Sequence, residues 1–159
     1  MKIGIDFDNT IASYDTLFHE VALRENFISR RWFGCGKIEL RNYLRTQPDG
    51  EKTWMKLQGL VYGKYMHCAE MMPGVANFIL SCKLRNHKVF IVSHKTEYGH
   101  YDLERISLRK EALKWMKSNR FFDSEYFGID KNNVFFAETR EEKVEKIAHL
   151  KCNWFIDDL

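Results

Sequence analysis

The sequence has 159 residues and a mass of 19.0 kDa, which fits a single domain or one core with a modest insertion. Apolar residues make up 45% and charged residues 30% of the chain, and the mean hydropathy of −0.45 excludes a protein wholly embedded in a membrane. With 25 basic and 22 acidic side chains, the net charge of +3 is too balanced to indicate nucleic-acid binding by itself.

The N-terminal part of the chain predicts a short buried strand followed by helices. Residues 2–6 are interpreted as a short buried strand that stops at the polar stretch 6–10. Apolar residues then recur at helical spacing over 14–28, and again over 54–66. Over 30–50 this pattern breaks up, and glycine and proline residues predict turns there.

The second half of the chain alternates predicted helices and strands. A proline and a glycine at 73–74 open a helix over 75–85, because a proline in the first helical turn removes only an N–H that lacks a partner there. Residues 88–93 contain a continuous apolar run, which is typical of a strand buried on both faces. The remaining elements are a helix over 103–118, a strand over 134–137, a helix over 141–150 and a strand over 153–157.

This alternation predicts an α/β fold with a parallel sheet and right-handed crossovers, in a three-layer Rossmann-like arrangement. About eighty residues separate the first strand from the second, far more than one crossover helix needs. We therefore expect a helical insertion at 14–72, and a core formed by 1–13 and 73–159.

The sequence contains no apolar run as long as a membrane span, and its N-terminus lacks a signal-peptide pattern. The four cysteines are scattered and form no C-x-x-C pair, so we expect reduced thiols. These observations predict a cytoplasmic protein without a membrane partner.

Chemically suggestive side chains follow three of the predicted strands. Asp6 and Asp8 end the first strand, Ser93 ends the second, and Asp157 and Asp158 end the last. Ligands of open α/β sheets bind outside the carboxyl ends of the strands. Carboxylates near the interior must be paired or bound to a metal, and several of them together favour a hard cation such as Mg²⁺.

The same residues resemble the four motifs of the haloacid dehalogenase (HAD) superfamily. Residues 6–11 resemble the first motif, D-x-D-x-T after an apolar strand, and Val92-Ser93 resembles the second. Lys143 resembles the third motif, and the paired aspartates within 155–158 resemble the fourth. Pro73-Gly74-Val75, ahead of the second motif, also fits the family. Order and spacing agree over two stretches, 1–10 and 72–159.

The resemblance implies a phosphatase mechanism with a covalent intermediate. Asp6 would attack phosphorus and form an aspartyl-phosphate. Asp8 would protonate the leaving alcohol and then deprotonate the attacking water. Ser93 and Lys143 would bind the non-transferred phosphoryl oxygens. An aspartate at position 8 also argues against dehalogenase activity within the family.

The resemblance further implies a Mg²⁺ site formed by Asp6, the backbone carbonyl of Asp8, and the pair Asp157 and Asp158. Which member of that pair binds the metal directly stays open. Thr10 either contacts phosphate or caps the following turn. Two other lysines are alternatives to Lys143 as the phosphate ligand, namely Lys95 and Lys146.

Two further regions are candidates for substrate recognition. His94 and Lys95 begin a loop, 94–100, which either recognises the leaving group or is an exposed polar loop. Cationic and aromatic residues in the insertion, such as those at 30–33, suit an anionic or ring-bearing substrate or form a solvated face. The insertion also contains three further basic residues, Lys37, Arg41 and Arg45.

We therefore expect a Mg²⁺-dependent phosphomonoester hydrolase acting on a small phosphorylated metabolite, with a small helical cap that excludes polymers. Phosphotransferase or mutase activity is a variant of this hypothesis. The alternatives are a phosphoacceptor signalling module of receiver type and a phosphatase acting on nucleic-acid ends, although we do not otherwise expect a nucleic-acid partner. The sequence does not indicate an oligomeric state. Superfamily members usually continue beyond the paired aspartates, so Leu159 implies either a missing C-terminal segment or an early end of the sheet.

Overall fold

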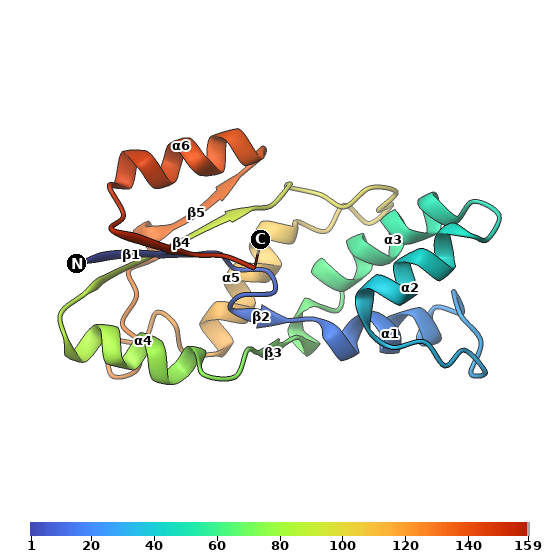
Figure 1. Ribbon diagram of the computed structural model, residues 1–159, viewed down its shortest axis with the longest axis horizontal. Helices are drawn as coiled ribbons and strands as arrows, with labels where there is room; N and C mark the ends of the chain where they lie inside the picture. The colour runs from blue at the N-terminus through green and yellow to red at the C-terminus, as the bar shows by residue number, and fades with distance from the viewer. Residues whose placement is uncertain (159) are drawn as a thin grey trace. The chain divides into compact units, whose positions relative to one another are not determined.

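The computed structural model describes residues 1–158, which contain a four-stranded sheet with the strand order β5-β4-β1-β6 (Figure 1). Its strands are β1 (Lys2–Ile5), β4 (Lys88–His94), β5 (Val134–Ala137) and β6 (Trp154–Ile156). All neighbouring strands run parallel. The predicted α/β class with a parallel, Rossmann-like sheet is therefore confirmed.

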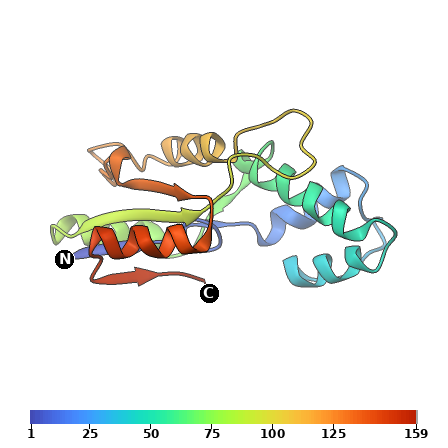
Figure 2. The ribbon, with the colours of Figure 1, turned by 90° about the horizontal axis from the view of Figure 1, so that it is seen from above.

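Helices cover both faces of this sheet. In Figures 1 and 2, α6 (Arg140–Leu150) and α4 (Val75–Leu84) lie on opposite faces. The interior of β4, from Val89 to Val92, is buried, as its apolar run predicts. Gly4 lets β6 pack closely, because a Cβ at this position would stand 2.4 Å from the Phe155 ring.

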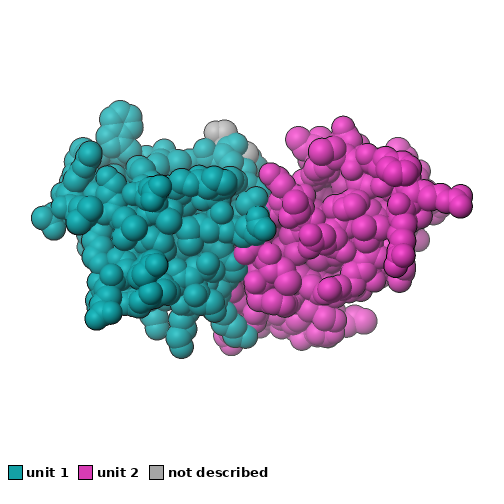
Figure 3. Space-filling view, turned by 90° about the horizontal axis from the view of Figure 1, so that it is seen from below, with its two compact units in different colours: residues 1–13, 70–96, 113–159 teal, residues 14–69, 97–112 magenta. Residues whose placement is uncertain are grey.

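The chain forms two compact units, which Figure 3 distinguishes by colour. The unit that contains the sheet comprises 1–13, 70–96 and 113–159, and the other comprises 14–69 and 97–112. The second unit is helical. It includes most of the predicted insertion together with the later segment 97–112. The predicted boundaries 1–13, 14–72 and 73–159 remain a prediction.

Three helices build the helical unit: α1 (Asp15–Arg24), α2 (Gly36–Arg45) and α3 (Gly50–Tyr62), followed by the 3₁₀ helix Met66–Cys68. Its core is aromatic and aliphatic. Phe18 of α1 stacks on Trp54 of α3 with ring centroids 5.2 Å apart. Leu57 of α3 is also fully buried.

Helix α2 lies within 30–50, where the sequence pattern predicts turns and no helix. Its buried residues are Leu40 and Leu44, one helical turn apart, and the helix packs on α1 and α3. Four residues at or beyond its ends indicated turns and so obscured the helix in the sequence, namely Gly34, Gly36, Pro48 and Gly50. Residues 37–45 are nevertheless mostly good helix formers, so local propensity and packing both favour this helix.

The sequence pattern also did not predict a two-residue antiparallel pairing. β2 (Ala12–Ser13) pairs with β3 (Glu70–Met71), and the Met72 N–H donates to the carbonyl of Ile11 at 2.8 Å. Two residues are too few to show a strand pattern. The pairing brings together the two ends of the inserted stretch.

Helix α5 spans Leu108–Ser118 and begins later than the predicted 103. Asp102 accepts hydrogen bonds from the N–H groups of Glu104 and Ile106, which holds this part of the chain in a non-helical turn. The hydroxyl of Ser107 accepts the Lys110 N–H at 3.1 Å and so caps the start of α5.

Across residues 1–158, none of the helices is both long enough and apolar enough to span a lipid bilayer. All four cysteines are free thiols in the structure.

Candidate active site

The candidate site lies at the carboxyl ends of β4, β1 and β6. Asp6 follows β1 directly, Ser93 is the penultimate residue of β4, and Asp157 follows β6. Because β1 lies between β4 and β6 in the sheet, these ends are neighbours. Asp6 is 6% exposed and Ser93 is 1% exposed, so both polar side chains are held in the interior.

A tight turn after β1 directs the first two aspartates. The Asp6 N–H donates to the carbonyl of Ile156 at 2.9 Å, which extends the pairing of β1 with β6. The Phe7 carbonyl then accepts the N–H groups of both Ile11 and Ala12. Asn9 has φ +58°, a left-handed conformation that asparagine tolerates better than most residues.

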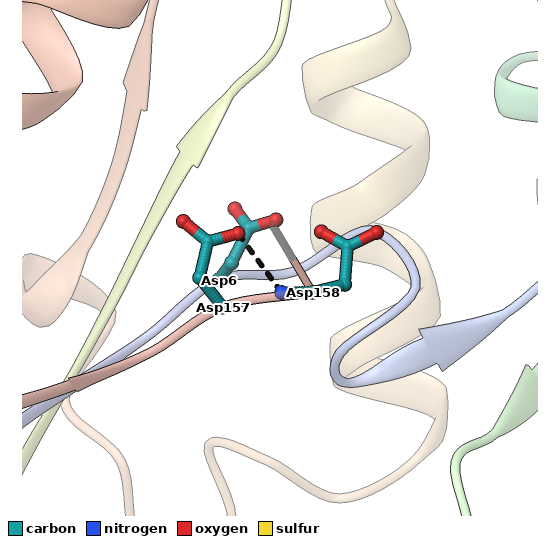
Figure 4. A group of neighbouring side chains, drawn as sticks. All are labelled: Asp6, Asp157 and Asp158. Carbon is teal, nitrogen blue, oxygen red and sulfur yellow. Dashed lines mark hydrogen bonds between the residues drawn. The ribbon is translucent and has the colours of Figure 1, made fainter.

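Three of the predicted metal-binding carboxylates converge. Asp6, Asp157 and Asp158 each offer an oxygen, and these oxygens lie within 4.8 Å of one another. Figure 4 shows the three side chains, from the turn after β1 and the segment after β6, pointing to the same side. The Asp158 N–H donates to the Asp157 carboxylate at 3.0 Å and holds that side chain in place. Such a set of hard oxygen donors is what a small divalent cation prefers.

Lys143 enters this acidic cluster from the first turns of α6. Its Nζ lies 2.8 Å from Oδ2 of Asp157 and 3.1 Å from Oδ1 of Asp6. The start of α6 is held by Thr139, whose side chain accepts the N–H of Glu142 at 3.1 Å. The cap fixes the first turn of α6. Lys143 lies one turn after Thr139, so the cap also helps to determine where the ammonium group points.

The two buried partners affect each other's ionisation. Burial raises the pKa of the Asp6 carboxyl above its ordinary value against the lowering effect of Lys143, and repulsion from Asp8 adds to the rise. Burial by itself lowers the pKa of the Lys143 ammonium. Its contacts with Asp157 and Asp6 outweigh burial, so the pKa of Lys143 is raised. A cation is thus fixed beside the predicted nucleophile.

Lys95 is a second buried lysine at the strand ends. Its side chain is 2% exposed, and its Nζ lies 2.8 Å from Oδ2 and 3.1 Å from Oδ1 of Asp8. The sequence predicted a contact with substrate for Lys95 but not this ion pair. Both residues lie just beyond the ends of their strands, where the alternation of a strand no longer determines the direction of a side chain.

Two hydroxyl oxygens in the predicted phosphate-binding set lack a hydrogen bond of good geometry among residues 1–158, although Ser93 lies close enough to Asp6 to lower the pKa of that carboxyl. They are Oγ of Ser93 and Oγ1 of Thr10, and both atoms are buried. An unpaired buried hydroxyl is uncommon in folded proteins and is often found where a ligand supplies the missing partner. Both can donate to an anionic oxygen.

The other candidate residues lie elsewhere. His94 is exposed, and its Nε2 lies 2.9 Å from the carbonyl of Glu138. The Lys146 ammonium lies over the Phe135 ring, 4.8 Å from its centroid. Arg45 of the helical unit pairs with Glu51 on the surface of that unit. None of these side chains joins the cluster of carboxylates and lysines.

Comparison with known proteins gives one informative match. A protein of Bacillus cereus that bears the name "Putative nucleotidase" is 22% identical over 165 residues, an alignment that covers 99% of this chain and 76% of the relative. No family model matches the chain.

Proposed function

We propose that this protein is a Mg²⁺-dependent phosphomonoester hydrolase of the HAD type, with Asp6 as the nucleophile. The observation that carries the proposal is the position of Asp6: a buried carboxylate in contact with Lys143, grouped with Asp157 and Asp158. The unpaired Ser93 hydroxyl at the adjacent strand end supports it. The similarity to a protein with a nucleotidase name supports phosphate-ester hydrolysis in general.

In the proposed reaction, an oxygen of Asp6 forms a bond to phosphorus while the bond from phosphorus to the leaving oxygen breaks. Asp8 gives its proton to the leaving oxygen, which departs as an alcohol. Asp8 then takes a proton from a water molecule whose oxygen attacks the phosphorus. That step releases inorganic phosphate and restores the Asp6 carboxylate. Lys143, Ser93 and Thr10 bind the three non-bridging oxygens of the phosphoryl group, away from the attacking and leaving oxygens.

The charges of the site fit a divalent cation. Among the described residues, four carboxylates gather at the strand ends, and the lysines that contact them are Lys143 and Lys95. Asp6, the Asp8 carbonyl, Asp157 and Asp158 would hold Mg²⁺ in this proposal. The ion would neutralise charge on the phosphoryl group and reduce repulsion between this group and Asp6.

We propose nucleoside monophosphates as the first substrate class to test, within the broader class of small phosphorylated metabolites. The name of the Bacillus cereus relative is the basis for this order. A panel of nucleoside monophosphates, sugar phosphates and an aryl phosphate, assayed with Mg²⁺ and with a chelator, measures which esters are hydrolysed.

The decisive variant is Asp6→Asn, which removes the nucleophile but keeps the size of the side chain. We expect a loss of hydrolysis by at least about 10³-fold. The matched control is Asp130→Asn, because Asp130 is exposed and its side chain only accepts a backbone N–H, which an asparagine carbonyl also accepts. Full activity of Asp6→Asn contradicts the mechanism. A phosphorylated protein that persists for minutes without releasing phosphate supports a receiver-type module instead.

A further inference from the structure

Lys95 holds both carboxylate oxygens of Asp8. Its Nζ lies 2.8 Å from one oxygen and 3.1 Å from the other, and the side chain is 2% exposed. A contact with both oxygens restrains rotation of the carboxylate as well as its position. Asp8 itself is 18% exposed at its side chain, so it keeps access to a ligand.

The backbone and stem of Lys95 are also fixed. Its N–H donates to the carbonyl of Ala137 at 2.9 Å and continues the pairing of β4 with β5. Its ammonium lies 5.7 Å from the centre of the Phe7 ring. Phe7 is fully buried and packs edge-on against Trp115 with ring centroids 5.5 Å apart. Lys95 is therefore held from both ends rather than extending into solvent.

The two buried lysines of the site contact different acids. Lys143, on α6, contacts Asp6 and Asp157. Lys95, which directly follows β4, contacts Asp8. A phosphate ligand in the proposed reaction must lie near the nucleophile, and Lys143 already meets this requirement. The contacts of Lys95 are instead directed at the acid that acts on the leaving group.

We infer that Lys95 is a positioning residue, which orients the Asp8 carboxyl group toward the leaving oxygen and does not bind the phosphoryl group. This inference rests on the proposed function, in which Asp8 protonates the leaving group. It assigns the second lysine to the departure of the alcohol, and it separates that step from recognition of phosphate.

The assignment has a kinetic signature. A nitrophenolate departs with little help from an acid, whereas an alkoxide must be protonated as its bond to phosphorus breaks. Misplacing Asp8 therefore slows the hydrolysis of an alkyl phosphate more than that of an aryl phosphate. Loss of a phosphate ligand slows both esters and weakens inhibition by inorganic phosphate.

The test compares Lys95→Met, which keeps the length of the side chain without its charge, with Lys95→Arg, which restores a cation. The matched control is Lys88→Met, an exposed lysine at the opposite end of β4. For each protein, kcat and KM are measured for p-nitrophenyl phosphate and for a nucleoside 5′-monophosphate, together with inhibition by inorganic phosphate. Circular dichroism checks folding, and Lys95→Gln replaces Lys95→Met if the latter does not fold.

We expect Lys95→Met to lose at least about tenfold more kcat/KM on the nucleotide than on the aryl ester, mainly in kcat. Phosphate inhibition should change by less than about twofold, and Lys95→Arg should recover part of the difference. Equal losses on both esters with weaker phosphate inhibition would overturn the role of Lys95, and so would kinetics like those of Lys88→Met. Either result leaves the proposed function intact. If the unsubstituted protein hydrolyses neither ester, the proposed function itself fails and the role of Lys95 fails with it.

Discussion

Asp6 shows how a single residue of the site opposes the stability of the fold. The side chain is buried, and burial is the largest influence on its ionisation. Its pKa is raised even though Lys143 lies 3.1 Å away, so the ionised form is less stable in the folded protein than in the unfolded chain. Residues that serve a reaction often carry such a cost.

The raised pKa predicts how the stability of Asp6→Asn depends on pH. Above the folded-state pKa, the native protein contains a disfavoured carboxylate, so the neutral asparagine should raise the melting temperature. Below the ordinary value of 3.8, the carboxyl group is protonated in both states and the difference should vanish. Thermal unfolding from pH 3 to pH 7 in a chelator measures this. A variant that is less stable than the unsubstituted protein at pH 7 contradicts the prediction.

At the scale of elements, the start of α6 connects helix stability to the site. Thr139 accepts the N–H of Glu142, and the Glu142 side chain accepts the N–H of Glu138 at 2.8 Å. The bond to Thr139 satisfies an N–H group that the first helical turn leaves free, and the bond from Glu138 fixes the residue that precedes the cap. Lys143 lies one residue beyond Glu142, so the cap also places the ammonium group beside Asp6.

Removing this cap should affect both stability and catalysis. We expect Thr139→Ala to lower the free energy of unfolding by about 1 kcal/mol, because the N–H of Glu142 loses its acceptor. Activity should fall as well, since fraying of the first turn loosens Lys143. Thr139→Ser is the matched control, because serine caps a helix as well as threonine does. Urea unfolding and phosphatase assays measure the two effects, and equal stability of the Ala and Ser variants contradicts the capping role.

The sequence was most informative where a pattern is local and complete. The strand at 134–137 was predicted with the bounds that the structure shows, because its apolar run is continuous. The helix Gly36–Arg45 was not, because the glycine and proline residues around it indicated turns although 37–45 are mostly good helix formers.

The same limit applies within the site. Each strand-end residue was identified by type and position, and the grouping of Asp6 with Asp157 follows from neighbouring parallel strands. The pair formed by Lys95 and Asp8 depends on how one long side chain crosses from β4 to the turn after β1. Sequence spacing alone does not determine such a path, because a lysine side chain has many rotamers.

At the scale of the whole molecule, the chain enters and leaves the helical unit twice. Segment 97–107 returns to this unit shortly after β4, which contains Ser93 and is followed by Lys95. It packs on α3 through Gly99 and Gly59, where a Cβ on Gly99 would stand 2.6 Å from the Gly59 Cα. The ammonium of Lys52 on α3 also lies over the Tyr101 ring, 5.5 Å from its centroid.

The glycine contact predicts an asymmetry between two similar substitutions. Gly99→Ala should lower the free energy of unfolding by about 1–3 kcal/mol, because the added methyl group overlaps backbone atoms of α3. Gly59→Ala should cost less, since its Cβ would meet Gly99 at 3.4 Å and alanine favours a helix. Urea unfolding measures both, and hydrogen exchange over 97–107 locates the change. Equal effects of the two substitutions contradict the prediction.

The pairing of β1 with β6 has a consequence for the order of events during biosynthesis. Lys2 and Asn153 are hydrogen-bonded to each other although 151 positions separate them. The other described strands and helices are therefore synthesised before β6 can pair with the open edge of β1. Asp157 joins Asp6 only when this pairing forms, so the acidic cluster is incomplete until then. In the interval, the unpaired edge of β1 exposes backbone N–H and C=O groups with which another strand can pair.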